Sequence, residues 1–240
     1  MEYNIFKEKL IRDLEEYQII NKENKEQYLN EKQIKRLYEY MMYILEKNQY
    51  INLTAIKEES KFIERHIVDS LYILKYINLL ENKVGKKRYL DLGTGGGFPL
   101  VPLKITLGFK SYGLDSILKK LKVIDEKENI NIIHERAEIA AHNNKYRETF
   151  DLVTTRAVSS LDNVIMYMSG FVKKNGIAVL LRGKEENINE DIVKKYGFVI
   201  SKKEKYELYG EERNIIILRK VKKLNSDLPI KEGKFYKENK

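Results

Sequence analysis

The sequence of 240 residues contains no cysteine, and this absence excludes several kinds of site at once. Disulfide frameworks, thiolate metal sites, iron–sulfur clusters and cysteine nucleophiles all need a thiol. The sequence also lacks any run approaching the roughly 18 apolar residues that a membrane-spanning helix needs. Residues 1–8 do not show the basic-then-apolar order of a secretory signal. We therefore expect a protein of the reducing cytoplasm that makes no membrane contact.

The charge is unbalanced toward the basic side, with 45 Lys and Arg against 36 Asp and Glu. Lysine greatly outnumbers arginine, a usage typical of A+T-rich genomes, so the total is weak evidence for a polyanionic partner. The distribution is more informative, because residues 219–240 carry 8 basic and 3 acidic groups. This C-terminal excess moderately favours nucleic acid as the partner.

Hydrophobic periodicity divides the chain into a helical part and an alternating part. Apolar residues recur at steps of three and four in 34–45 and in 58–79, which predicts two amphipathic helices. Residues 1–54 are expected to form a helical extension, 55–219 the main domain and 220–240 a frayed basic tail.

From residue 88 onward the pattern predicts strands that alternate with helices. This alternation indicates an α/β, Rossmann-like fold with a mostly parallel seven-stranded sheet and helices on both faces. The last two strands have no helix between them and should form a closing antiparallel hairpin. Strands are expected at 89–92, 110–115, 131–134, 150–155, 176–181, 198–202 and 214–219, and helices at 117–128, 160–173 and 185–195.

The loop after the first of these strands is rich in glycine. Gly93, Gly95 and Gly97 allow a sharp turn and a close approach of the backbone to a ligand. Dinucleotide sites usually have a third glycine where this chain has Phe98. The carboxylate of Asp91 suits a ligand that carries an ammonium and a sulfonium, such as S-adenosylmethionine, and would repel a pyrophosphate. A tight turn without any ligand is the alternative.

Two later strand ends could complete a nucleoside site. The carboxylate of Asp115 fits the two hydroxyls of an adenosine ribose, although it could instead cap the following helix. After the third strand, Ala137 offers a small side chain beside an adenine ring, and Glu138 a carboxylate near its amine.

These residues together resemble the RsmG (glucose-inhibited division protein B) family over about residues 50–219. That family consists of bacterial S-adenosylmethionine-dependent methyltransferases that modify guanine N7 in 16S ribosomal RNA. The resemblance implies their Rossmann-like fold, activity and RNA partner, and cofactor contacts at Gly93, Phe98, Ala137, Glu138 and Arg156. We expect the protein to act as a monomer. The matching segments are 52–56, 65–71, 91–99, 114–116, 136–138, 155–161 and 182–184.

A few positions depart from the family pattern. Leu100 replaces a frequent glycine, and Arg182 replaces a lysine but keeps the positive charge. Val158 replaces a phenylalanine, which puts a stacking role there in doubt.

The sequence also restricts the atom that could accept a methyl group. Residues 103–228 contain no proline, so the Asn-Pro-Pro-Tyr motif typical of exocyclic-amine methylation is absent. Methylation of pyrimidine carbon-5 generally needs a cysteine nucleophile. Guanine N7 carries a lone pair and no proton, so alignment alone could supply ~7–11 kcal/mol of the barrier without a general base. We therefore predict residues that position the reactants and none that transfer protons.

Several basic residues are candidates for the target side of the site. Arg156 could bind the cofactor or an RNA phosphate, or form a structural ion pair with Glu138. Arg182 and Lys184 could grip RNA phosphates or lie in a solvated loop.

Arg65 and His66 share a predicted helix with Ser70 and Asp69. N7 chemistry leaves no task for a His–Ser or His–Asp catalytic pair. His66 should therefore shape an RNA-facing groove, with Arg65 beside it, or be a satisfied polar residue.

Two other classes of function stay open. A nicotinamide-dependent oxidoreductase would share the glycine loop, but Phe98 and Asp91 argue against it. A non-catalytic RNA-binding module would bind RNA in a salt-dependent manner without cofactor affinity.

Overall fold

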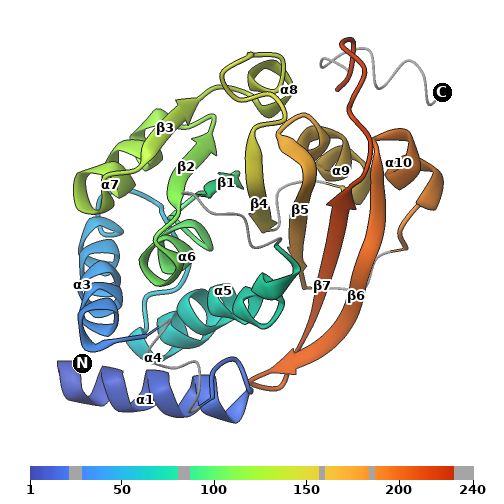
Figure 1. The fold of residues 1–240 in the computed structure, drawn as a ribbon. Helices are drawn as coiled ribbons and strands as arrows, with labels where there is room; N and C mark the ends of the chain where they lie inside the picture. Colours follow the sequence, from blue (N-terminus) through green and yellow to red (C-terminus); the bar gives the residue numbers. More distant parts are fainter. Residues whose placement is uncertain (22–28, 81–86, 157–159, 184–186, 230–240) are drawn as a thin grey trace.

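The fold is built around a single curved sheet (Figure 1). The computed structural model describes residues 1–21, 29–80, 87–156, 160–183 and 187–229. In these residues the strand order is β3-β2-β1-β4-β5-β7-β6. The strands are β1 (Arg88–Leu92), β2 (Lys110–Asp115), β3 (Asn131–His134), β4 (Phe150–Arg156), β5 (Val172–Arg182), β6 (Phe198–Leu208) and β7 (Glu211–Lys220).

The predicted topology is confirmed. Strands β1 to β5 run parallel, and β7 runs antiparallel to both β5 and β6. The parallel strands are short apolar runs because helices cover both faces of the sheet. A connection of two residues joins β6 to β7, which is why no helix separates them.

The N-terminal part is helical, as predicted. The segment 34–45 lies within α3, whose first turn is closed by a capping box between Asn30 and Gln33. The segment 58–79 forms one continuous helical rod, in which α-helical, π-helical and 3-10-helical segments follow one another. Arg65 and His66 lie in the π-helical segment. Such turns often occur at functional sites. The helices are α1 (Tyr3–Glu16), α3 (Glu31–Lys47), α4 (Glu59–Phe62), η1 (Ile63–Val68), α5 (Asp69–Leu71) and η2 (Tyr72–Leu79).

The remaining helices lie between the strands. The predicted helix 160–173 is wrong beyond Ser169, because Gly170 ends α9 and β5 already begins at Val172. Of the helix predicted over 185–195, the described residues form α10 from Glu190, capped by the Asn189 side chain, and residues 185 and 186 lie outside the described part. These helices are α6 (Leu100–Leu107), α7 (Leu118–Glu128), α8 (Ala137–Ala140), α9 (Leu161–Ser169) and α10 (Glu190–Lys195).

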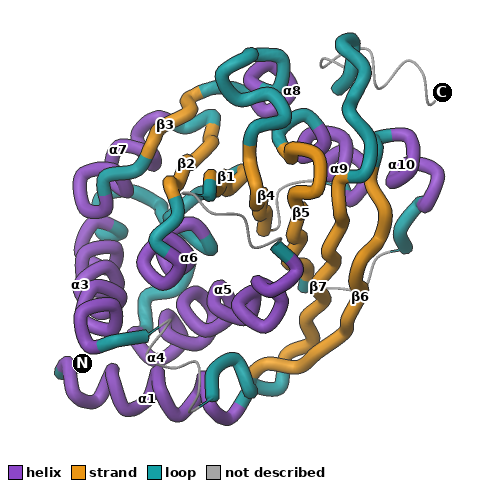
Figure 2. Tube along the Cα trace, viewed as in Figure 1, coloured by secondary structure: helices purple, strands orange, loops and turns teal. Residues whose placement is uncertain are grey.

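Each face of the sheet has its own apolar cluster. One cluster joins the N-terminal helices, α6 and α7 to the sheet, and the other joins α8, α9 and α10 to the opposite face. Figures 1 and 2 show this layering, with α1, α3 and the α4–α5 rod along one side. The N-terminal helices thus share a core with the glycine-loop region.

The described chain beyond β7 is held at a few points as far as residue 229, where Leu224 is buried and Leu228 packs on the apolar cluster beneath α9. The expectation of a frayed tail is therefore wrong for that part. Lys220, the last residue of β7 and the first of the expected tail, is fully buried and donates from Nζ to the carbonyl oxygen of Ser169 at 2.6 Å. Arg147 donates to the carbonyl oxygens of Asn225 at 2.6 Å and Leu228 at 2.8 Å. Residues 230–240 lie outside the described part of the chain.

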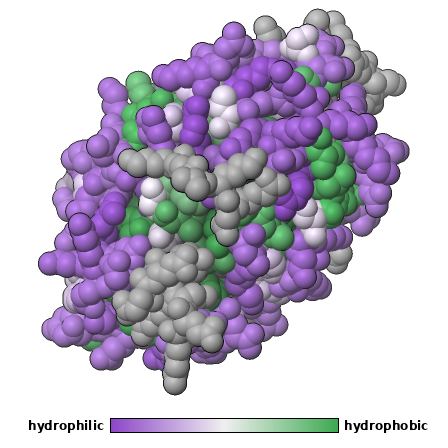
Figure 3. Space-filling view, in the orientation of Figure 1, coloured by the Kyte–Doolittle hydropathy of each residue, from purple (hydrophilic) through white to green (hydrophobic). Residues whose placement is uncertain are grey.

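The surface is mainly polar. On the face drawn in Figure 3, hydrophilic residues predominate and hydrophobic ones gather in small patches. None of the described helices combines the length and apolarity needed to cross a membrane.

Candidate active site

The glycine loop lies at the carboxyl end of β1, between that strand and α6. Gly93, Gly95 and Gly97 all have positive φ angles, of 73°, 55° and 88°. A Cβ on Gly97 would lie 2.2 Å from Oη of Tyr40, whereas the nearest atom to a Cβ on Gly95 is 3.9 Å away. The loop therefore packs tightly against α3 at Gly97 and is open at Gly95. This open space would allow a ligand to approach the backbone closely.

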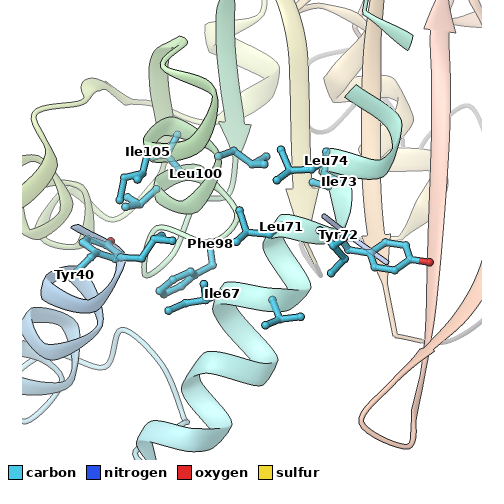
Figure 4. Packing of buried hydrophobic residues seen from close by; sticks show 14 of the residues in the cluster. Tyr40, Ile67, Leu71, Tyr72, Ile73, Leu74, Phe98, Leu100 and Ile105 are labelled. Atoms are coloured by element: carbon cyan, nitrogen blue, oxygen red, sulfur yellow. The ribbon is translucent and has the colours of Figure 1, made fainter. Parts of the chain in front are cut away.

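Phe98 points away from this open side. Its side chain is only 4% exposed and stacks on the ring of His66, with centroids 4.5 Å apart and an interplanar angle of 8°. Tyr40 and Phe62 meet it edge-on at 5.8 and 5.3 Å. Figure 4 shows Phe98 between α3 and the α4–α5 rod. Any ligand contact at this position would come from the main chain.

The carboxylate of Asp91 lies behind the loop and is 1% exposed. Its Oδ1 accepts a hydrogen bond from Thr154 Oγ1 at 2.7 Å, and its Oδ2 has no partner among the described residues. Burial raises the pKa of Asp91 to about 6, against the lowering effect of the Thr154 hydroxyl and the Arg156 charge. The Thr94 hydroxyl and the Leu100 amide also act to lower this pKa, so nearby donors stabilise part of the charge. A cationic group would add to this stabilisation, directly or through water.

Asp115 joins the second strand to the glycine loop. Its Oδ2 accepts from the amide of Gly95 at 3.0 Å, and its Oδ1 from the amide of Ile117 at 2.9 Å. The capping alternative is thus partly realised, because Ile117 directly precedes α7. Each oxygen keeps a further lone pair, so the carboxylate can still accept from hydroxyls.

The loops after β2 and β3 lie together, joined by a 3.1 Å contact between His134 Nε2 and the carbonyl oxygen of Ser116. Ile117, in the loop after β2, and Ile139, in α8 after β3, are each 47% exposed. Neither isoleucine was predicted from the sequence, although an apolar residue two positions after Asp115 was a usable signal. They provide apolar surface next to a carboxylate, as an adenosine would need.

Glu138 is buried beside Ala137, at the start of α8. Its Oε1 accepts from Arg136 Nε at 2.7 Å. The suggested ion pair between Arg156 and Glu138 is therefore wrong.

Arg156 instead pairs with the helical rod. Its Nη1 donates to the carbonyl oxygen of Arg65 at 2.9 Å and to Asp69 Oδ2 at 3.2 Å, and its Nη2 lies 3.0 Å from His66 Nδ1. Asp69 also accepts from Arg213 Nε at 3.3 Å. Residues 65–69 thus hold Arg156, the last residue of β4, in a fixed orientation.

His66 is 7% exposed, and both of its ring nitrogens are engaged. Its Nε2 lies 2.6 Å from Thr54 Oγ1. Of the two predictions made for His66, the structure agrees with the second. The ring is a satisfied polar group behind the site and does not lie on an RNA-facing surface. Ser70 donates to the His66 carbonyl oxygen, so the ring and the hydroxyl form no catalytic pair. Arg65 remains partly exposed and forms an ion pair with Glu211.

The Asn-Leu-Thr segment forms a loop held by Asn48. The Asn48 side chain accepts from the amides of Leu53 and Thr54 and donates to the Thr54 carbonyl oxygen. An open groove of about 1120 Å³ runs between α3 and this loop, with Thr54 in its wall. Thr54 therefore connects the groove to His66 and the glycine loop.

Arg182 ends β5 and lies opposite Asn214 in the register with β7. Arg156 lies opposite Leu181 in the register of β4 with β5, so both arginines are at the carboxyl ends of their strands. Lys184 and Val158 lie outside the described residues.

Comparison with known proteins identifies the family. A family model described as rRNA small subunit methyltransferase G matches residues 33–217. The chain belongs to the rRNA small subunit methyltransferase G family. Proteins named ribosomal RNA small subunit methyltransferase G include one from Lactococcus lactis subsp. lactis, 36% identical over 85% of this chain and 90% of its own length. Another, from Clostridium novyi, is 34% identical over 90% and 94%.

Solved structures share the fold. A mutant of MtNAS in complex with S-adenosylmethionine has a TM-score of 0.51 and 15% sequence identity, over 78% of this chain and 75% of that one. A complex of MtNAS with MTA and tNA has the same TM-score and identity. The predicted Rossmann-like methyltransferase fold is thereby confirmed.

Proposed function

We propose that this methyltransferase transfers a methyl group from S-adenosylmethionine to N7 of a guanine in 16S ribosomal RNA, as a cytoplasmic monomer. The observation that carries the proposal is the glycine loop, open at Gly95 and bonded there to the Asp115 carboxylate. Membership of the rRNA small subunit methyltransferase G family supports the class of substrate.

The residues around the loop fit S-adenosylmethionine. The backbone of the loop at Gly93 and Gly95 would face the cofactor, and Asp115 would accept from its ribose hydroxyls. Ile117 and Ile139 would cover the adenine, with Ala137 and Glu138 beside it. When bound, this cofactor supplies a methyl group on a positively charged sulfur.

The charged groups fit the amino-acid end of the cofactor. The unpartnered Oδ2 of Asp91 suits its ammonium, and Arg156 suits its carboxylate because a guanidinium binds carboxylates through paired donors.

The acceptor side needs no proton transfer. Guanine N7 has no proton to lose, so the protein has only to hold the base in line and exclude water. The ring of His66, with both nitrogens engaged, is consistent with this. Arg182, Lys184 and Arg65 would hold the RNA backbone.

Calorimetric titration with S-adenosylmethionine, with NADH as the comparison, tests the cofactor assignment. We expect binding of S-adenosylmethionine alone, with Gly95→Asp losing at least about tenfold in affinity (~1.4 kcal/mol). Gly108→Asp is the matched control, since Gly108 also has a positive φ angle, of 65°, and open space but lies at the far end of α6. Binding of NADH would favour an oxidoreductase, and RNA binding without either ligand would favour a non-catalytic module.

A further inference from the structure

We propose that His66 is a positioning residue, whose ring offers Nδ1 as a hydrogen-bond acceptor and thereby holds the Arg156 guanidinium toward the cofactor. The inference deepens the proposed function, because it rests on Arg156 as a cofactor-binding residue. It assigns the histidine a task that requires neither proton transfer nor contact with RNA.

The chemistry of the two partners fixes the tautomer. A guanidinium has only donors, so the Nδ1 that lies 3.0 Å from Arg156 Nη2 must carry a lone pair. The ring proton is then on Nε2, where it is donated to Thr54 Oγ1 at 2.6 Å. An imidazolium would place an N–H against the guanidinium and is disfavoured.

The ring has little freedom to leave this orientation. It stacks on Phe98, and Phe62 meets it edge-on, with centroids 4.8 Å apart and an interplanar angle of 85°. Burial and the charge of Arg156 lower the pKa of His66 to about 3, against the raising effect of the Arg65 carbonyl. The ring is therefore neutral throughout the physiological range and always able to accept.

Arg156 is thereby held on one side only. Its Nη1 is used by Arg65 and Asp69, and one Nη2 proton is directed at His66. Nε and the second Nη2 proton make no hydrogen bond to any residue that the structure describes, and the side chain is 22% exposed. The guanidinium thus keeps a pair of adjacent donors for a carboxylate, oriented by His66 and Asp69.

Two substitutions separate this role from simple packing. In His66→Asn the amide oxygen takes the place of Nδ1 and can still accept from Arg156. In His66→Gln the amide lies near the position of Nε2 and can reach Thr54 instead. Both remove the ring from Phe98, so they serve as matched controls for the loss of stacking.

We expect His66→Asn to keep S-adenosylmethionine affinity within about threefold of the parent, and His66→Gln to lose at least about tenfold. In an Arg156→Ala background His66→Gln should have no further effect on affinity. Equal losses in the two single variants, at equal melting temperatures, would overturn the proposal. Absence of any binding by the unsubstituted protein would instead refute the proposed function.

Nitrogen-15 NMR of the imidazole in the full chain gives a second readout that needs neither cofactor nor a variant. We expect a proton on Nε2, an unprotonated Nδ1 and no titration between about pH 5 and 8. A proton on Nδ1 would overturn the proposal.

Discussion

The hydroxyl of Tyr40 donates a 2.9 Å hydrogen bond to the carbonyl oxygen of Gly96. The first residue lies in α3 and the second in the glycine loop, 56 positions apart. The N-terminal helices therefore do more than cover the sheet, because they hold the backbone that is proposed to bind the cofactor.

Tyr40→Phe should weaken this connection. The change leaves the Gly96 carbonyl without its buried partner, which costs about 1–3 kcal/mol of unfolding free energy. We expect a similar fall in S-adenosylmethionine affinity relative to the parent, because the loop loses its fixed position. Urea unfolding and calorimetry measure the two effects. Tyr38→Phe is the control, since its hydroxyl donates to the Met1 carbonyl oxygen away from the loop, and cofactor affinity should not change there.

Gly97→Ala should be strongly destabilising, because its φ of 88° and the 2.2 Å approach to Tyr40 both oppose a Cβ. Part of the cost is the collision with the Tyr40 hydroxyl. The substitution should therefore cost less in a Tyr40→Phe background, and the double-mutant cycle measures this coupling. Strict additivity of the two changes in unfolding free energy would contradict the packing described.

Asp91→Asn should raise stability and lower cofactor affinity. The native pKa of about 6 exceeds the ordinary value of 3.8, so the folded protein binds more protons between these values. Stability then falls as the pH rises through this window and stays lower above it. At pH 7.5 the variant should gain up to about 3 kcal/mol, and the gain should shrink toward about pH 4. A gain that does not depend on pH would exclude the charged carboxylate as its cause.

Arg182→Ala tests the proposed RNA contact at the end of β5. Loss of one phosphate contact should reduce the slope of log affinity against log salt by about 1 and weaken binding to all RNA sequences alike. Cofactor affinity measured without RNA should be unchanged. Filter binding at several salt concentrations provides the slope, and an unchanged slope would place Arg182 outside the RNA interface.

The sequence predicted the fold well where local patterns control it. The runs that end in Leu92 and Asp115 marked their strands correctly, because parallel strands covered on both faces leave a clear signal. The boundary at Gly170 was missed because apolar residues continue from α9 into β5, and periodicity does not distinguish the end of a helix from the start of a strand.

The site was harder to predict because its contacts join distant segments. Arg156 was singled out, but its partners His66 and Asp69 lie 90 and 87 residues away, and no local spacing indicates that pairing. Phe98 was noted for the glycine that it replaces, whereas its burial against Tyr40 depends on how α3 packs. Residues fixed by tertiary packing leave no periodic signature in one sequence.

Mass spectrometry of nucleosides from methylated ribosomal RNA tests the central claim most directly. The purified protein is incubated with S-adenosylmethionine and either 16S ribosomal RNA or small subunits from a strain that lacks this gene, with Gly95→Asp as the inactive control. We predict 7-methylguanosine in at least one of the two substrates, formed in a one-to-one ratio with S-adenosylhomocysteine and absent with the control. Transfer to an exocyclic amine or to a pyrimidine, or no transfer by a protein that binds S-adenosylmethionine, would contradict the account.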